Sequence, residues 1–247
     1  PQKNIECLNI WQEFISAIPK EIRLPGFPIW GMEFGATYPY NGTHPFRMTS
    51  KELGSYKGNF GASLKGLTKK EQFRLLPSYA RTKKAFPSWK KRYIEQNRIF
   101  FQENKRHIIK VMEKISNLPS QSWQKLEWNV GESHRNLFDY ILQFRASGIR
   151  IKKVDFFPSL VCTNTQIPII GWEKRYITKS EGLKLQSLEG IKLPDNNSTA
   201  FKALGNAVNS YIVKLIAERL INENNQTNCV SQGILKEITI NTTNEGN

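Results

Sequence analysis

The sequence predicts a mixed α/β (α+β) fold, in which an irregular basic region is followed by a compact region of short strands and helices. Three observations predict this class: helical spacing of apolar residues near both ends, an aromatic segment rich in glycine and proline at 24–50, and β-rich runs after about residue 145. The 247 residues are 39% hydrophobic and 11% aromatic, which is enough to bury a core and too much for a disordered chain.

The N-terminal region should begin with a helix and continue as ordered loops. Apolar residues three and four apart at 5–18 predict an amphipathic helix that ends at Pro19. Eight glycines and prolines punctuate 24–50, but its aromatic residues need a packing surface, so this loop should be ordered. Four glycines at 54–66 predict a flexible basic loop.

Two further helices are expected before residue 119. Thr68 and Glu71 match a capping box, which predicts a short helix through Leu76. A longer helix should follow Pro87, with a break or bend near 103–106, where polar residues interrupt its apolar stripe.

The C-terminal part should alternate short strands and helices. Runs at 159–163 and 167–170 predict strands, and the first would bury Cys162. Thr178 opens a second capping box and helix, and apolar spacing predicts a final helix at 208–221. We expect the Asn-rich tail, 222–247, to be partly mobile.

Positive charge is concentrated in one part of the chain. The formal net charge is +15, and residues 51–110 hold 16 Lys/Arg against four acidic residues, a local charge of +12. Such a block, interleaved with aromatic residues, is typical of a polyanion-binding surface, with nucleic acid favoured. A solvated face without a partner is the alternative. A membrane surface fits less well, because apolar and basic residues are mixed through loops.

The cysteine pattern argues against disulfides and metal. The sequence has three widely spaced cysteines, Cys7, Cys162 and Cys229, and this odd number fits a reducing cytoplasm better than a set of disulfides. The three histidines are also scattered, so the sequence predicts no Cys/His metal site. The sequence has no run of about 18 apolar residues and therefore predicts no membrane span. We therefore expect a cytoplasmic protein.

Two blocks in the C-terminal part resemble a known family. The first is Arg175-Tyr-Ile-Thr178-Lys-Ser-Glu181-Gly-Leu-Lys-Leu185-Gln186-Ser, and the second is Ala200-Phe-Lys-Ala-Leu-Gly205-Asn206-Ala207-Val208-Asn209. They look like the ninth and tenth conserved blocks of DNA (cytosine-5) methyltransferases of restriction–modification systems. Segments at 27–38, 145–150, 158–161 and 167–171 are also similar to members of that family, so the likeness covers most of residues 8–220.

The resemblance implies a domain arrangement and a function. It implies an N-terminal helix at 1–23, a target-recognition (DNA-binding) region at 24–144, and a return to the Rossmann-like catalytic domain at 145–221, before the 222–247 tail. The enzyme would transfer a methyl group from S-adenosylmethionine to C5 of cytosine in a specific sequence of double-stranded DNA. The resemblance also implies a bacterial protein that is associated with the nucleoid.

The chemistry of that family needs residues that this sequence lacks. The nucleophile is a cysteine that follows a proline, and here no cysteine does so. The Glu-Asn-Val motif and the glycine-rich cofactor loop are also missing. No catalytic residue is therefore assigned, and the isolated chain is predicted inactive until a complementary methyltransferase half or subunit joins it. A natural split enzyme and a truncated gene product both fit.

The resemblance and the charge pattern together assign site residues. Gly205, Asn206, Ala207 and Val208 would contribute part of the S-adenosylmethionine pocket, with Gly205 allowing close approach and Asn206 capping the next helix. The bracing residues between recognition and catalytic domains would be Arg175, Thr178, Glu181 and Gln186. The residues expected to contact DNA, mainly its phosphates, are Lys69, Lys70, Arg74, Arg81, Lys83, Lys84, Lys90, Lys91, Arg92, Arg145, Arg150, Lys152 and Lys153.

Another class of function remains open at this point. A stand-alone DNA-binding protein, such as a regulator or specificity module, would share the basic region but need no methyl donor or second chain. An RNA-binding protein ranks third, because no stacking-sheet signature is present.

Overall fold

The computed structural model describes residues 2–132 and 134–222, and contacts divide the chain into two compact units. Unit 1 contains the residues up to Leu160 together with Thr165–Ile177. Unit 2 contains Val161–Asn164 and the residues from Thr178 onward. The observed structure is a mixed α+β fold, as the sequence predicted. The strand-rich segment after residue 145 shares its sheet with strands of the preceding basic region.

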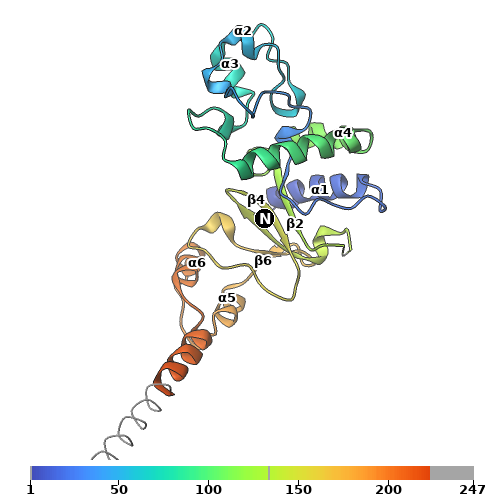
Figure 1. Ribbon diagram of the computed structural model, residues 1–247. Helices are drawn as coiled ribbons and strands as arrows, with labels where there is room; N and C mark the ends of the chain where they lie inside the picture. The colour runs from blue at the N-terminus through green and yellow to red at the C-terminus, as the bar shows by residue number, and fades with distance from the viewer. Residues whose placement is uncertain (1, 133, 223–247) are drawn as a thin grey trace, which may run out of the picture. The chain divides into compact units, whose positions relative to one another are not determined.

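The helices of unit 1 largely follow the sequence signals. The bounds are α1 Gln2–Ala17, α2 Ser50–Leu53, α3 Lys69–Arg74 and α4 Ser88–Ser116. The Thr68–Glu71 capping box is formed in both directions at α3, and Thr49 and Glu52 form another at α2, which the sequence analysis missed. Figure 1 shows α1 beside α4, and the two helices are in contact.

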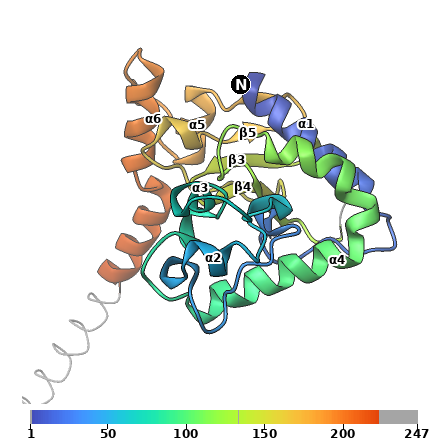
Figure 2. The ribbon, with the colours of Figure 1, turned by 90° about the horizontal axis from the view of Figure 1, so that it is seen from above.

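Of the break or bend predicted near residues 103–106 of the long helix α4, the break is not formed, although the helix changes direction along its length (Figure 2). It is a single 29-residue α-helix. Asn104 is buried, but its Nδ2 donates to the Phe100 carbonyl of the same helix at 2.9 Å. Because the side chain finds a partner on its own helix, and apolar neighbours pack on both sides of it, the polar run remains helical.

Six strands of unit 1 form one sheet in the order β1-β2-β4-β3-β5-β6. β2 and β4 are parallel, and the other pairs are antiparallel. The bounds are β1 Ile29–Trp30, β2 Lys125–Asn129, β3 Ile141–Arg145, β4 Gly148–Lys152, β5 Ile169–Ile170 and β6 Arg175–Tyr176. Short 3₁₀ turns are η1 Gly31–Glu33, η2 Pro45–Arg47, η3 Asn59–Gly61, η4 Ser78–Ala80, η5 Leu137–Asp139 and η6 Asn164–Gln166.

The register of the central strands separates an apolar face from a polar face. Leu126 pairs with Ile149, and Trp128 pairs with Ile151, so these buried side chains share one face. That face belongs to the hydrophobic core that also includes α1 and α4. Alternation places Glu127, with its register partner Arg150, on the opposite face. One face of the sheet therefore builds the core, and the other carries charge.

The loop segments of the basic region form a second hydrophobic cluster. It consists of Trp30, Met32, Ala36, Tyr38, Leu53, Leu64, Leu76, Ala80, Phe86 and Ile94. These residues come from the 24–50 loop, from the segments around α2 and α3, and from the first turns of α4. The helices α2 and α3 contact each other and lie close together in both views (Figures 1 and 2). The aromatic loop is thus ordered, as expected.

The predicted strand at 159–163 is not formed, and this prediction was wrong. β3 already pairs with β4 and β5, so it offers no free edge to a further strand. Instead, Gln143 Nε2 donates to the carbonyls of Ser159, at 3.4 Å, and Gln166, at 3.0 Å. Cys162 is exposed, while Cys7 is buried in α1, where burial raises the pKa of its thiol to about 12.

Unit 2 contains helices α5, Lys179–Leu185, and α6, Asn197–Asn206, and residues 210–222 are also helical. The second capping box, Thr178 with Glu181, is confirmed at α5. The apolar residues of the 210–222 helix are exposed. No helix in the described part of the chain has the length and apolar character to cross a membrane. Most of the Asn-rich tail, from residue 223, lies outside the described residues.

Candidate nucleic-acid interface

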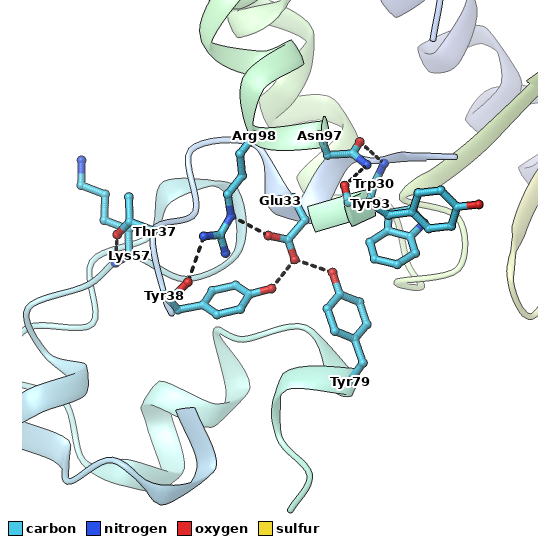
Figure 3. Close-up of polar contacts among 9 residues, drawn as sticks. All are labelled: Trp30, Glu33, Thr37, Tyr38, Lys57, Tyr79, Tyr93, Asn97 and Arg98. Atoms are coloured by element: carbon cyan, nitrogen blue, oxygen red, sulfur yellow. Dashed lines mark hydrogen bonds and ion pairs between the residues drawn. The ribbon is translucent and has the colours of Figure 1, made fainter. Parts of the chain in front are cut away.

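A buried carboxylate organises the basic region of unit 1 (Figure 3). Glu33 lies in η1 and is fully buried, and the hydroxyls of Tyr38 and Tyr79 both donate to its Oε1. Arg98 of α4 donates from Nε to Oε2 at 3.0 Å. Burial, together with the Glu33 charge, raises the pKa of both phenols well above their ordinary value. This cluster ties the loops to α4.

Asn97 makes a second connection between β1 and α4. Its Oδ1 accepts from the Trp30 backbone amide at 2.7 Å. Its Nδ2 donates to the carbonyls of Pro28, at 3.0 Å, and Tyr93, at 2.8 Å. Since a buried amide with three partners holds its neighbours in place, the Trp30 backbone is firmly positioned against α4.

An aromatic groove lies beside these two clusters. Its volume is about 630 Å³, and β2 contributes Lys125, Glu127 and Asn129. The rest of the lining is Gly26, Pro28, Trp30, Ser78, Tyr79, Trp89, Lys90, Tyr93 and Ser147. Two ammonium groups therefore enter a groove with four aromatic side chains, a composition suited to a planar, negatively charged ligand.

A lysine groove of about 770 Å³ lies in the region of α2. Its lining residues are Ser50, Lys51, Gly54, Ser55, Tyr56, Lys57, Ser63, Lys65, Gly66 and Leu67. None of these lining residues is acidic. The Lys57 backbone amide donates to Thr37 Oγ1 at 2.8 Å, which fixes the loop that carries this lysine (Figure 3). Lysines and small hydroxyl residues together suit a phosphate backbone.

Two of the predicted DNA-contacting residues instead bind the chain's own backbone. The Lys69 ammonium donates to the carbonyls of Pro45 and Met48, and burial lowers its pKa. Arg81 donates from Nε and Nη2 to the Leu76 carbonyl, at 2.9 and 2.6 Å. These side chains hold the segments around α3, so much of their hydrogen-bonding capacity is used inside the fold.

Other predicted DNA-contacting residues are more accessible. Lys70, Arg74, Lys83, Lys84 and Arg92 are exposed, and Lys90 and Lys91 are half-buried at the start of α4. The Lys83 ammonium lies 5.9 Å from the centre of the Phe46 ring. Accessibility is compatible with a phosphate-binding role, and that role stays a prediction.

The predicted residues of β3 and β4 gather on the polar face of the sheet. Glu127 lies between Arg145, whose Nη2 is 2.5 Å from Oε1, and Arg150, whose Nε is 3.0 Å from Oε2. The Lys152 ammonium lies 4.5 Å from the centre of the Phe156 ring, and Lys153 is exposed. Arg145 and Arg150 are thus already neutralised in part by an internal carboxylate.

The predicted bracing residues fall in both units. Arg175, in β6 of unit 1, donates from Nε to Glu173 at 2.6 Å. Glu181, in unit 2, accepts from the Thr178 amide at 2.7 Å in the capping box. Gln186 Nε2 donates to the carbonyls of Leu204 and Ala207, at 3.0 and 3.3 Å. Gln186 therefore connects the 175–187 segment to the 200–209 segment.

The 200–209 segment also binds back to the 175–187 segment. Asn209 Nδ2 donates to the Leu185 carbonyl at 3.0 Å, and the Ser210 amide donates to the Gln186 carbonyl at 3.0 Å. Asn209 Oδ1 also accepts from the Ile212 amide at 3.1 Å. Asn209 therefore caps the 210–222 helix, and the prediction that Asn206 does so was wrong, because Asn206 is the last residue of α6.

The predicted cofactor residues contact other parts of unit 2. A Cβ built on Gly205 would lie 2.3 Å from the Val161 carbonyl carbon, so the chain's own backbone fills the space beside this glycine. The Cys162 Sγ donates to Asn206 Oδ1 at 2.6 Å. Ala207 is half-buried, and Val208 is 68% exposed. Gly205 does permit close approach, but of backbone rather than of a ligand.

Several residues of the candidate interface were not singled out from the sequence. Two of the three partners of Glu33, Tyr79 and Arg98, are distant along the chain, and so are the rings that Lys125 contacts, so no local motif marks these two residues. Lys51, Lys57 and Lys65 were counted in the basic block, but only folding shows that they line one groove. The cluster of glycines and serines around them was the available signal.

Comparison with known proteins relates the chain to a methyltransferase. The relative is the type II methyltransferase M.AluI of Cellulosimicrobium cellulans, 33% identical over 138 residues. The matched region is 53% of this chain but only 26% of the relative, so the chain spans about a quarter of that protein's length. No protein-family model and no solved structure matches.

Proposed function

We propose that this chain is the DNA-recognition part of a DNA (cytosine-5) methyltransferase of a restriction–modification system. The observation that carries the proposal is the interlock of the ninth and tenth blocks, because Gln186 and Asn209 each bind the other block's backbone. The relationship to a methyltransferase supports the same reading. The complete enzyme would transfer a methyl group from S-adenosylmethionine to C5 of cytosine in a specific DNA sequence.

The basic region of unit 1 would hold double-stranded DNA. Lys51, Lys57 and Lys65 of the lysine groove, together with exposed basic side chains such as Lys70 and Lys84, would bind phosphates. Phosphate contacts position a duplex but do not read its sequence, so loop side chains beside them would contact base edges in the major groove.

The proposed cofactor and nucleophile need residues beyond those described. The space beside Gly205 is filled by the backbone of Val161 and Cys162, so any contact of 205–208 with S-adenosylmethionine would come from its other residues. No cysteine follows a proline, so the nucleophile must come from polypeptide outside these 247 residues.

The exposed apolar face of the 210–222 helix supports a complementary catalytic part. Ile212, Leu215 and Ile216 are each about half exposed, at 54%, 47% and 56%. Large exposed apolar patches mark interaction surfaces, so this helix would dock on the catalytic part. The chain alone should then have low solubility.

A methyl-transfer assay tests the proposal. We expect no transfer from labelled S-adenosylmethionine to DNA by this chain alone. Transfer should appear after mixing with the product of a neighbouring reading frame that encodes a Pro-Cys motif and a glycine-rich cofactor loop. The matched control is the same mixture with the cysteine of that product replaced by alanine.

Two outcomes would contradict the proposal. Turnover by this chain alone would show that the nucleophile assignment is wrong. Verified assembly of the two polypeptides without turnover would favour a stand-alone DNA-binding protein, because such a protein needs the basic region but no methyl donor.

A further inference from the structure

The aromatic groove contains a continuous series of rings. The rings of Trp30 and Tyr79 are 5.1 Å apart, those of Trp30 and Tyr93 are 5.6 Å apart, and those of Tyr93 and Trp89 are 5.9 Å apart. Trp30 is buried, but Trp89 is 49% exposed at the end of the series. A large aromatic side chain that is both packed on one side and open on the other can stack a flat ligand.

Two lysines converge on the same rings. The Lys90 ammonium lies 5.2 Å from the centre of the Tyr79 ring, and the Lys125 ammonium lies 5.6 Å from it. Burial lowers the pKa of both lysines, and the charge of Lys90 lowers that of Lys125 further. Two partly desolvated cations this close to one ring favour an anion between them.

The nearby carboxylates are already engaged. Glu33 accepts from Arg98 and from two tyrosine hydroxyls, and Glu127 pairs with Arg145 and Arg150. Neither Lys90 nor Lys125 has a carboxylate within ion-pairing distance among the described residues. A ligand would therefore supply the negative charge that balances Lys90 and Lys125.

We infer that the aromatic groove binds one unstacked nucleotide of a nucleic-acid strand, with its base on Trp89 and Tyr93 and its phosphate between Lys90 and Lys125. The groove volume of about 630 Å³ lies within the range of about 300–1,000 Å³ that is usual for small-ligand sites. Ser78, Asn129 and Ser147 supply polar groups for base edges.

The groove is organised before a ligand binds. Glu33 holds the Tyr79 hydroxyl, and Asn97 holds the Trp30 amide (Figure 3). A binding site whose walls are already fixed loses less conformational entropy when its ligand enters. The groove is proposed as a binding site only, since no cysteine of this chain is among its lining residues.

This inference rests on the proposed function, since the strand would be part of the recognised DNA. The test measures the affinity of the full chain for two labelled duplexes by fluorescence anisotropy. One duplex is fully paired, and the other has the same sequence with a single bulged thymidine. The full chain should bind the bulged duplex roughly tenfold more tightly, because a base stacked on an aromatic side chain contributes that order of affinity.

Three variants identify the groove as the source of that preference. Trp89→Ala should abolish the preference, and Trp89→Phe should keep most of it because the ring is retained. Trp172→Ala, which removes another exposed tryptophan of unit 1 outside the groove, should leave it unchanged. Thermal unfolding checks that each variant is folded, which is expected because Trp89 is half exposed.

The outcomes separate this inference from the proposed function. Equal affinity of the full chain for both duplexes, or a preference that survives Trp89→Ala, would overturn the groove assignment. Tight binding of the paired duplex would still support the recognition role in those cases. Conversely, Trp89-dependent binding of the bulged duplex, in a chain that never restores methyl transfer, would support the groove and count against the methyltransferase proposal.

Discussion

Basic side chains in unit 1 fall into two groups, those that stabilise the fold and those that are accessible to a ligand. Lys69 and Arg81 donate to backbone carbonyls and stabilise the segments around α3. Lys70 and Lys84 are exposed and are free to meet a phosphate. Sequence position does not distinguish them, since Lys69 and Lys70 are neighbours, and only the direction of each side chain in the fold separates structural from binding cations.

Neighbouring lysines therefore make a matched pair of variants. Lys69→Ala should lower the free energy of unfolding by about 1–2 kcal/mol, because two backbone carbonyls lose a charged donor. Lys70→Ala should change stability by less than about 0.5 kcal/mol and weaken DNA binding instead. Urea denaturation and DNA anisotropy measure the two effects. Equal stability of the two variants would contradict this division.

Glu33 illustrates why part of the candidate site could not be predicted from the sequence. Its partners Tyr79 and Arg98 lie 46 and 65 residues further along the chain. Nothing in the residues around Glu33 indicates that it will be buried, since an isolated carboxylate is ordinarily exposed. By contrast, the basic block was visible because charge composition is a property of the local sequence.

Helix boundaries were predicted best where local chemistry sets them. The capping boxes at Thr68 and Thr178 need only residues three apart, so the sequence shows them directly. The 159–163 run failed as a strand because a strand also needs a partner strand beside it, which depends on contacts with distant residues. Residue type favours a strand, but topology decides whether it can form.

Gly205 tests the packing of α6 in unit 2. Replacing a helical glycine by alanine ordinarily stabilises a helix by about 1 kcal/mol. Here the new Cβ would lie 2.3 Å from Val161 backbone, so Gly205→Ala should destabilise unit 2 by about 1–3 kcal/mol. Faster amide hydrogen exchange in α6 would report the change.

Lys202→Ala is the matched control for that variant, because Lys202 is an exposed position of the same helix. It should leave hydrogen exchange in α6 almost unchanged. If Gly205→Ala slowed exchange instead, helix propensity would outweigh the close backbone contact, and the packing explanation for this glycine would be wrong.

The charge of the whole chain matters through its distribution. A net charge of +15 would attract any polyanion, but the lysine groove gathers Lys51, Lys57 and Lys65 without an acid in its lining. If they bind phosphates, counterion release makes affinity depend steeply on salt. The response to salt therefore separates a dedicated DNA surface from a general excess of positive charge.

Salt titration of the double variant Lys51→Ala/Lys65→Ala measures this contribution. The slope of log affinity against log salt should become shallower by up to about 1.8, since each phosphate contact contributes about 0.9. The control is a Lys105→Ala/Lys110→Ala variant, which removes two exposed lysines of α4 outside the groove. Equal changes in slope for both pairs would show that the groove has no special role.

The sequence determined the class of fold, most helices and the location of the charge, because these depend on local spacing and composition. Only the tertiary structure decided which lysines line a groove, why position 205 has no room for a larger residue than glycine, and how Glu33 and Asn97 hold the walls of the aromatic groove in place. Those features depend on contacts between distant residues, and neither spacing nor composition records such contacts.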